Sequence, residues 1–329
     1  MVRKLKSALD PAAQRLVDGL LASPVPGPET GTPEDARRAF RDGRRAFAPA
    51  PPEVARVQDL PATPDRPAMR LYRPWGTTDR EVLPVFLFFH SGGWVSGDLE
   101  THDNACRSIA NAGRCAVVAV DYALAPERPF PAAIEDAQVA YHHVTAAADE
   151  LLIDPRRIAV GGDSAGANIA AVLALILRDE GRPQPCGQIL IYPATDFAAR
   201  TASRAEFETG PTLNVAALEW FAGQYLPNPA LATDWRASPL RAASHADLPP
   251  ALVVTCGHDP LRDEGIAYAD RLEAAGVPVR RRHFPGQIHG FLTMGGIMPE
   301  TTILIGEIAA ELQRAFANWR DDDWGDRAS

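Results

Sequence analysis

Residues 158–170 read Ile-Ala-Val-Gly-Gly-Asp-Ser-Ala-Gly-Ala-Asn-Ile-Ala and join an apolar strand to a helix through one sharp turn. The turn carries a G-x-S-x-G motif, Gly162-Asp163-Ser164-Ala165-Gly166. The helix is indicated by apolar residues that recur at helical spacing, Ile169, Val172, Leu173 and Ile176. A serine in such a strained turn needs small residues two positions to either side, and its hydroxyl then projects above the sheet beside a helix N-terminus. This context predicts that Ser164 is a nucleophile, rather than part of a glycine-rich connection without chemistry.

Short apolar runs alternate with helical stretches from about residue 83 onward. Strand candidates are Val85–Phe89, Ala116–Val120, Ile158–Gly161, Gln188–Ile191, Leu252–Thr255 and Val279–Phe284. Helix candidates are Thr101–Ala112, Ala132–Ala147, Ala165–Arg178, Leu261–Ala275 and Thr301–Trp319. Several of the strands are apolar on both faces, as in a parallel sheet covered by helices on two sides. The alternation predicts an α/β fold with a mostly parallel, doubly wound sheet.

Three segments do not follow this alternation of strands and helices. Prolines cluster at residues 24–33 and 49–67, which we expect to form loops around short elements. Residues 196–242 read as an insertion that contains a helix over Val215–Tyr225. Between the proline clusters, Glu34–Phe47 has helical periodicity. Its polar stripe is arginine-rich: Arg37, Arg41, Arg44 and Arg45. Such a cluster could bind an anion, but we favour a solvated helix face. The charged tail, residues 321–329, is expected to fray.

A serine nucleophile needs a base, and the base needs an acid that orients it. In folds with this turn the chain order is Ser, then Asp or Glu, then His. Asp259 follows a strand at the sheet edge where parallel sheets hold their sites, and we prefer it to Asp263, which would lie a turn into the next helix. His289 is the base candidate, because it alone of the eight histidines sits in a glycine-flanked loop after the last strand.

The reaction also needs N–H donors for an oxyanion, each contributing about 10²–10³ in rate. The strand candidate Val85–Phe89 runs into His90-Ser91-Gly92-Gly93-Trp94, a glycine turn whose backbone can point N–H groups at a ligand. We predict Gly92, Gly93 and Ala165 as the donors. Trp94 and Asp163, which adjoin the donor loop and the nucleophile, are predicted to bind substrate.

The composition excludes several classes of protein. The chain has 329 residues, 33 Lys and Arg against 42 Asp and Glu, and a net charge of −9, which disfavours nucleic-acid partners. Its apolar runs are far shorter than the roughly 20 residues of a membrane span, and no signal peptide is visible. The four cysteines contain no CxxC pair, which is typical of neither a zinc ribbon nor a disulfide scaffold. We expect a cytoplasmic protein without membrane partners.

Together these motifs resemble the hormone-sensitive lipase family, the bacterial type IV esterases, within the α/β-hydrolases. The resemblance covers about residues 70–316. It rests on His90-Ser-Gly-Gly-Trp-Val-x-Gly-Asp98, Asp121-Tyr-x-Leu-Ala-Pro-Glu127, Pro129-Phe-Pro-Ala132, Gly162-Asp-Ser-Ala-Gly166, Asp259-Pro-Leu-Arg-Asp263 and His289-Gly-Phe291. It implies an α/β-hydrolase fold over residues 51–329, with a helical cap built from residues 1–50 and an insertion at about 196–242. It also implies the triad Ser164, Asp259 and His289, the oxyanion donors Gly92, Gly93 and Ala165, and no metal or organic cofactor.

The resemblance implies a carboxylester hydrolase acting on short-to-medium acyl esters, as the GDSAG subgroup does. Aromatic residues of the cap segments are expected to limit the acyl length: Phe40, Phe47, Phe207, Trp220, Phe221, Tyr225 and Trp235. An amidase or formamidase could use the same triad. A non-catalytic receptor is the other class, since the plant gibberellin receptor resembles this family without the histidine, but His289 is present here.

The chain departs from the family at four positions: Ser91, Ala123, Arg128 and Ala167. Ser91 stands where the family usually has glycine, and its side chain is expected to narrow or polarise the oxyanion loop. Asp121 and Glu127 are interpreted as structural residues near the site. Relatives often dimerise through the strand Val279–Phe284, so the partners we expect are a small ester and a second copy of the chain. Its arginines, Arg280, Arg281 and Arg282, could instead protect a sheet edge against strand pairing.

Overall fold

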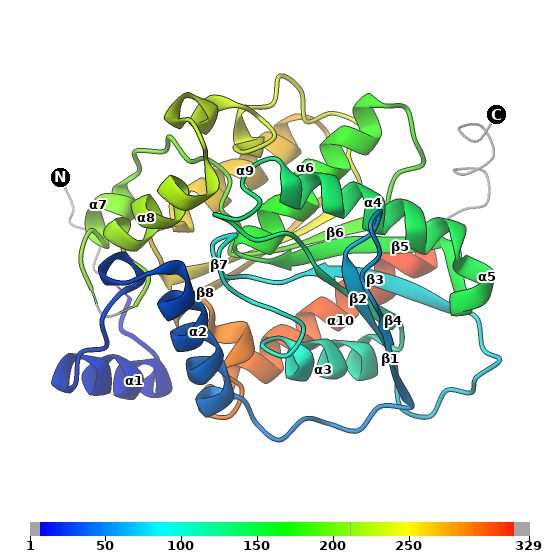
Figure 1. Cartoon of the computed structure of the whole chain (residues 1–329), viewed down its shortest axis with the longest axis horizontal. Helices are drawn as coiled ribbons and strands as arrows, with labels where there is room; N and C mark the ends of the chain where they lie inside the picture. The colour runs from blue at the N-terminus through cyan, green and yellow to red at the C-terminus, as the bar shows by residue number, and fades with distance from the viewer. Residues whose placement is uncertain (1–6, 211, 319–329) are drawn as a thin grey trace.

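The computed structural model describes residues 7–210 and 212–318 (Figure 1). The tail at 321–329 and the expected end of the last helix, Trp319, lie outside the described residues.

An eight-stranded sheet runs through the molecule in the order β1-β2-β4-β3-β5-β6-β7-β8. The strands are β1 Arg56–Leu60, β2 Ala68–Arg73, β3 Leu83–Phe89, β4 Ala116–Asp121, β5 Ile153–Asp163, β6 Gly187–Ile191, β7 Ala251–His258 and β8 Val279–Ile288. β2 is antiparallel to both of its neighbours, and the pairs from β4 to β8 are parallel. The prediction of a mostly parallel sheet flanked by helices is confirmed.

Helices cover both faces of the sheet and gather at one end of it. They are α1 Pro11–Ala22, α2 Pro33–Phe47, α3 Asp103–Gly113, α4 Ala132–Ala146, α5 Ala148–Leu151, α6 Ala165–Asp179, α7 Ala202–Glu206, α8 Val215–Tyr225, α9 Arg262–Ala274 and α10 Glu300–Asn318. Short 3-10 turns lie at Pro28–Thr30, Pro229–Thr233, Pro239–Arg241 and Phe291–Thr293. In Figure 1, α4, α6 and α9 lie on one face and α3 and α10 on the other, while α1, α2, α7 and α8 lie together beyond the sheet.

The core has two apolar layers because successive residues of a strand point to opposite faces. In β3, Val85, Leu87 and Phe89 join the layer under α4, α6 and α9, whereas Phe86 and Phe88 join the layer over α3 and α10. All five side chains are fully buried. This explains why the strand reads as a continuous apolar run rather than as an alternating one.

Two strands were not predicted individually. β1 lies within the proline cluster at 49–67 and β2 directly follows it, and they form an antiparallel pair that extends the sheet beyond β4. Charged residues interrupt the apolar pattern of both strands, and β1 is largely exposed. Helix α1 was also not predicted individually, although Ala13, Leu16, Val17 and Leu20 recur at helical spacing. Among the described residues, no helix is long and apolar enough to span a bilayer.

Candidate active site

Ser164 sits in the turn between β5 and α6 with φ 56° and ψ −115°, a left-handed conformation that is rare for a residue with a side chain. The glycines on either side make this turn feasible. A Cβ built on Gly162 would lie 2.2 Å from the carbonyl oxygen of Phe89, and one on Gly166 would lie 1.9 Å from the same oxygen. The motif therefore needs glycine at both positions because the turn packs directly onto the end of β3.

The structure brings Ser164, His289 and Asp259 into one line of hydrogen bonds. Nε2 of His289 lies 2.9 Å from Oγ of Ser164, and its Nδ1 lies 2.8 Å from Oδ2 of Asp259. Asp259 follows β7 and is fully buried, and its other oxygen accepts the backbone N–H of Leu261. His289 follows β8, with its ring 4.7 Å from that of Tyr192. Both oxygens of the carboxylate are thus fixed, which orients the imidazole toward the serine.

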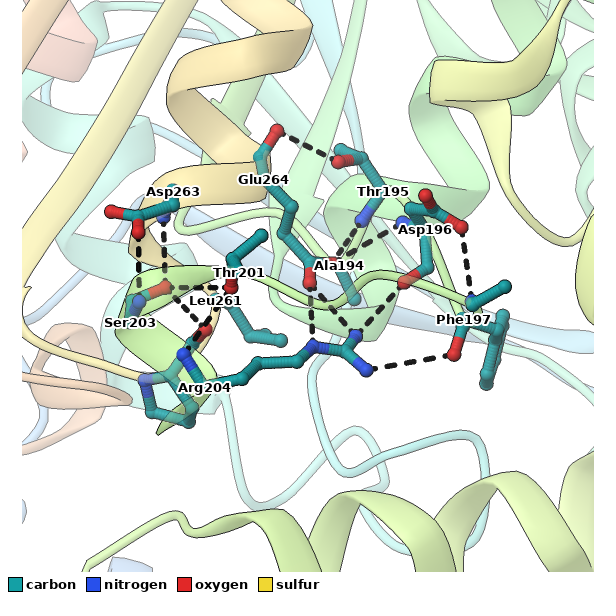
Figure 2. A network of polar contacts seen from close by, with 12 residues as sticks. Ala194, Thr195, Asp196, Phe197, Thr201, Ser203, Arg204, Leu261, Asp263 and Glu264 are labelled. Carbon is teal, nitrogen blue, oxygen red and sulfur yellow. Dashed lines mark hydrogen bonds and ion pairs between the residues drawn. The ribbon is translucent and has the colours of Figure 1, made fainter. Parts of the chain in front are cut away.

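Asp263, the rival acid, has a different task. Its Oδ2 accepts the backbone N–H of Ser203 at 2.7 Å, and its Oδ1 accepts Nε of Arg262. Figure 2 shows this contact beside a second one between the same helices, in which Arg204 of α7 donates two hydrogen bonds to Glu264 of α9. Asp263 therefore anchors α7 to α9 and lies apart from His289.

Glu264 is a buried carboxylate that the sequence analysis did not single out. Its Oε1 accepts the backbone N–H groups of Thr195 and Asp196, and its Oε2 faces Arg204 at 2.8 Å (Figure 2). Burial raises the pKa of Glu264 to about 7, and Arg204 and the two N–H groups oppose that rise. This network fixes the segment after β6 against the first turn of α9, directly behind the Asp259 loop.

The expected oxyanion donors lie on the loop after β3 and at the start of α6. Gly92 has φ 127° and Gly93 has φ 62°, both in the left-handed range. A Cβ on Gly92 would lie 2.0 Å from the carbonyl oxygen of Ser96, and one on Gly93 would lie 2.4 Å from the ring of Phe221. Within the described chain, the backbone N–H groups of Gly92, Gly93 and Ala165 donate to no other residue. They are available to a substrate oxygen.

Asp163 does not face the substrate side. Its side chain is fully buried and is not among the residues that line the cavity over Ser164. Tyr192 donates to its Oδ2 at 3.1 Å, and Nε2 of His102 lies 3.3 Å from its Oδ1. Burial raises the pKa of Asp163, but His102 and a hydrogen bond from Ser91 outweigh burial and lower it. Asp163 therefore holds the turn from behind, and we do not carry it into the proposed substrate site.

Ser91 lies at the start of the oxyanion loop and borders the cavity over Ser164. Its Oγ lies 3.1 Å from Nε2 of His102, and the residue is 3% exposed. Its expected effect of narrowing or polarising the oxyanion loop stays a prediction.

A cavity of about 1980 Å³ opens over Ser164 and His289. Residues of α1, α2, α7 and α8 line it, so both expected cap segments border the site. Trp94 forms part of the wall and stacks on Tyr225, with ring centroids 4.7 Å apart. Of the cap aromatics, Phe40, Phe47 and Phe221 reach the cavity. Phe207, Trp220, Tyr225 and Trp235 are not among its lining residues.

Comparison with known proteins agrees with this geometry. Residues 86–293 match a family described by the alpha/beta hydrolase fold. The chain belongs to the hormone-sensitive-lipase-like α/β hydrolases. This hydrolase is 42% identical over 306 residues to the esterase LipI of Mycobacterium tuberculosis, covering 90% of this chain and 92% of LipI. It is 38% identical over 271 residues to an ethyl acetate hydrolase of Pseudomonas putida, covering 81% and 85% of the two chains.

Among solved structures, the hydrolase is similar to ester-hydrolase EH1AB1 from the metagenome of Lake Arreo. The TM-score is 0.90 at 42% sequence identity, covering 94% of this chain and 100% of the other.

Sequence reasoning missed Tyr192, which links this hydrolase's nucleophile turn to its histidine loop. The Tyr192 hydroxyl donates to Asp163 and accepts the backbone N–H of Leu292 at 3.3 Å. Burial raises its pKa well above the ordinary value, so the hydroxyl stays protonated. The only local signal for Tyr192 is its position directly after β6. A tyrosine in such a position is also expected simply to pack in the core.

Proposed function

We propose that this carboxylic ester hydrolase cleaves short-to-medium acyl esters through an acyl-enzyme, with Ser164 as nucleophile, His289 as base and Asp259 as the orienting acid. The observation that carries the proposal is the unbroken line of hydrogen bonds from Ser164 through His289 to Asp259, at 2.9 and 2.8 Å. A serine hydroxyl is a weak nucleophile near neutral pH, and this arrangement removes its proton as it attacks.

The reaction proceeds in two halves. Oγ of Ser164 attacks the ester carbonyl carbon while Nε2 of His289 takes its proton, and the N–H groups of Gly92, Gly93 and Ala165 hold the oxyanion. His289 then gives the proton to the departing alcohol as the C–O bond breaks. Water then attacks the acyl carbonyl carbon while His289 takes its proton. His289 returns this proton to Oγ of Ser164 as the acyl C–Oγ bond breaks, which releases the acid and restores the free serine.

The cavity supports a preference for short acyl chains. Each buried methylene gains about 0.8 kcal/mol until the chain reaches a wall, and further length then introduces strain. Trp94 and the cap residues Phe40, Phe47 and Phe221 supply bulky walls. The ethyl acetate hydrolase among the relatives acts on a short ester by its name. We place the chain in the GDSAG subgroup of the type IV esterases on its Gly162–Gly166 motif.

The test is an initial-rate panel of p-nitrophenyl esters from acetate to palmitate, with the Ser164→Ala variant as the blank. We expect the kcat/KM optimum between acetate and hexanoate and little turnover of palmitate. An optimum at dodecanoate or beyond would show an open channel and overturn the chain-length proposal. Hydrolysis of acetanilide, measured in the same assay, distinguishes an amidase from an esterase. If the amide were hydrolysed faster than the esters, the amidase alternative would replace the esterase proposal.

The Ser164→Ala variant is also a prediction in its own right. Its kcat should fall by about 10⁴–10⁶, since the reaction loses its covalent step, and its far-UV circular dichroism should match that of wild type. Retention of a tenth of wild-type activity in cleanly purified variant would contradict the nucleophile assignment.

A cytoplasmic location remains part of the proposal. It is supported by the four cysteines, which are buried free thiols. Such thiols are typical of a reducing compartment. Fractionation of the source cells tests this directly, and recovery of the protein outside the cytoplasm would contradict it.

A further inference from the structure

The arginine side chains of α2 differ in their contacts. Arg37 forms a bidentate pair with Glu127 and also donates to the carbonyl oxygens of Val95 and Ala125. Arg41 pairs with Glu34 at 3.3 Å, and Arg45 is exposed. Arg38 also borders the cavity that holds Ser164 and His289, but it pairs with Asp35 at 2.5 Å. Arg44 differs from these four, since it lines the cavity without an ion pair to any described residue.

The Arg44 guanidinium lies close to the catalytic loop. Its Nη2 would be 3.1 Å from a Cβ built on Gly290, the residue after His289. Its Cζ lies 4.4 Å from the ring centroid of Phe40, one helical turn earlier. Both Arg44 and Phe40 border the cavity, so the cation stands at the wall where the cap meets the histidine loop.

This cation has no anionic partner in the described part of the chain. Among the described residues the guanidinium forms no ion pair with a carboxylate, and its buried Nε has no hydrogen-bond acceptor. Burial lowers the pKa of Arg44, while the more distant Tyr192 and Asp163 oppose that change. Arginine nevertheless stays protonated in proteins, so the site holds a positive charge with unused donors.

A purely structural role leaves these donors unexplained. The last turn of a helix favours a cation, and the face of Phe40 attracts one. Both effects act on the charge as a whole and require no directed N–H bond. The planar fork of arginine matches a carboxylate, whose two oxygens accept parallel hydrogen bonds.

We infer that Arg44 is a specificity residue that binds a carboxylate carried by the ester substrate, in addition to its scissile ester group. This inference rests on the esterase function proposed above. The carboxylate belongs to either the acyl or the alcohol part, and the chemistry of recognition is the same. The substrates are then half-esters of short dicarboxylic acids or esters of acidic alcohols and phenols.

The experiment compares matched anionic and neutral esters by pH-stat at pH 7.5. Monoethyl succinate against ethyl pentanoate tests the acyl side, and 4-acetoxybenzoate against 4-ethylphenyl acetate tests the alcohol side. In the Arg44→Gln variant the anionic-to-neutral ratio of kcat/KM should fall about 10- to 100-fold in one pair, through KM. Arg44→Lys should keep part of the ratio, because it retains charge without the fork.

Arg45→Gln is the matched control, since it removes a neighbouring exposed charge outside the cavity and should leave both ratios unchanged. A second readout uses wild type alone: succinate should inhibit ethyl pentanoate hydrolysis at least about tenfold more strongly than neutral succinamide. Ratios within twofold of wild type in Arg44→Gln, or equal inhibition by the two compounds, would overturn this inference and leave the esterase function standing. Absence of turnover of every ester in wild type would overturn both.

Discussion

Three residues around the site hold positive φ angles despite having side chains: Trp94 at 60°, Ser164 at 56° and Tyr192 at 37°. Each such conformation costs on the order of 1–3 kcal/mol and persists only where the surroundings enforce it. Each of the three follows the end of a strand in the parallel sheet, β3, β5 or β6. The packed sheet therefore stabilises the strained backbone that positions the oxyanion loop, the nucleophile and the tyrosine behind it.

The choice between the two aspartates gives a prediction at this scale. Asp259→Asn should lower kcat by about 10⁴, because an amide that donates to Nδ1 of His289 stabilises the wrong tautomer. Asp263→Asn should change kcat less than about tenfold, since its carboxylate contacts Ser203 and Arg262 instead. Steady-state kinetics on p-nitrophenyl acetate measure both. A greater loss in Asp263→Asn would refute the assignment of Asp259.

At the scale of elements, the contact between the start of α6 and the end of β3 sets how closely helix and sheet approach. Gly166→Ala should lower the free energy of unfolding by about 2–3 kcal/mol or prevent folding, because its Cβ would meet the Phe89 carbonyl oxygen at 1.9 Å.

Gly306→Ala on α10 is the control for that substitution. A Cβ there meets nothing within 4 Å, so we expect unchanged or slightly higher stability, by about 0.4–1 kcal/mol. Urea unfolding of both variants decides the matter. Equal free energies of unfolding would show that α6 and β3 can move apart at little cost, and that this contact is not the reason for glycine in the motif.

The end of β4 carries a carboxyl group that makes stability depend on pH. Burial, assisted by the charge of Asp98, raises the pKa of Asp121 to about 6. The folded chain thus binds this proton more tightly than the unfolded chain, whose aspartates titrate near 3.9. The contribution of Asp121 to the free energy of unfolding is therefore highest below about pH 4, falls as the pH rises to about 6, and is level above that.

Asp121→Asn should abolish this loss. Relative to wild type, the variant should gain about 1 kcal/mol between pH 4.5 and 7.5, a value reduced for partial solvent screening. Asp65→Asn, which changes an exposed carboxylate, should give no such pH-dependent difference. Chemical unfolding at pH 4.5 and 7.5 measures the free energy of unfolding of each protein. The same change between the two pH values in Asp121→Asn and in wild type would contradict this prediction.

At the scale of the whole molecule, β8 is an edge strand of the sheet. Its arginines are engaged by the chain's own helices: Arg280 by Glu311, Arg281 by Asp270 and Glu273, and Arg282 by Glu307. Their charge is thereby partly neutralised, which weakens the usual protection of an edge against pairing. We expect a homodimer through β8. Light scattering should give twice the 35.5 kDa of one chain, and a single 35.5 kDa species at micromolar concentration would reject the dimer.

The amino-acid sequence is sufficient to predict the architecture and the type of reaction. The turn at Ser164, the glycines after β3 and the order of strands and helices are local, because sterics and hydrophobic periodicity act over a few residues. The fold class follows from them and is confirmed by the structure and the comparisons. Local patterns did not predict β1 and β2. β2 pairs with β4 and β1 pairs with β2, so both strands depend on contacts with the rest of the sheet.

The directions in which particular side chains point depend on tertiary packing. Asp259 and Asp263 are the same residue type in neighbouring positions. Asp263 does not reach His289, because the packing of α7 on α9 pairs its carboxylate with the backbone N–H of Ser203. Asp163 neighbours the nucleophile in sequence yet faces His102 and Tyr192 in the core. Arg44 and Arg45 are adjacent, and the orientation of α2 over the sheet turns the first into the cavity and the second to solvent. These directions arise from packing between segments far apart in the chain, which no local pattern encodes.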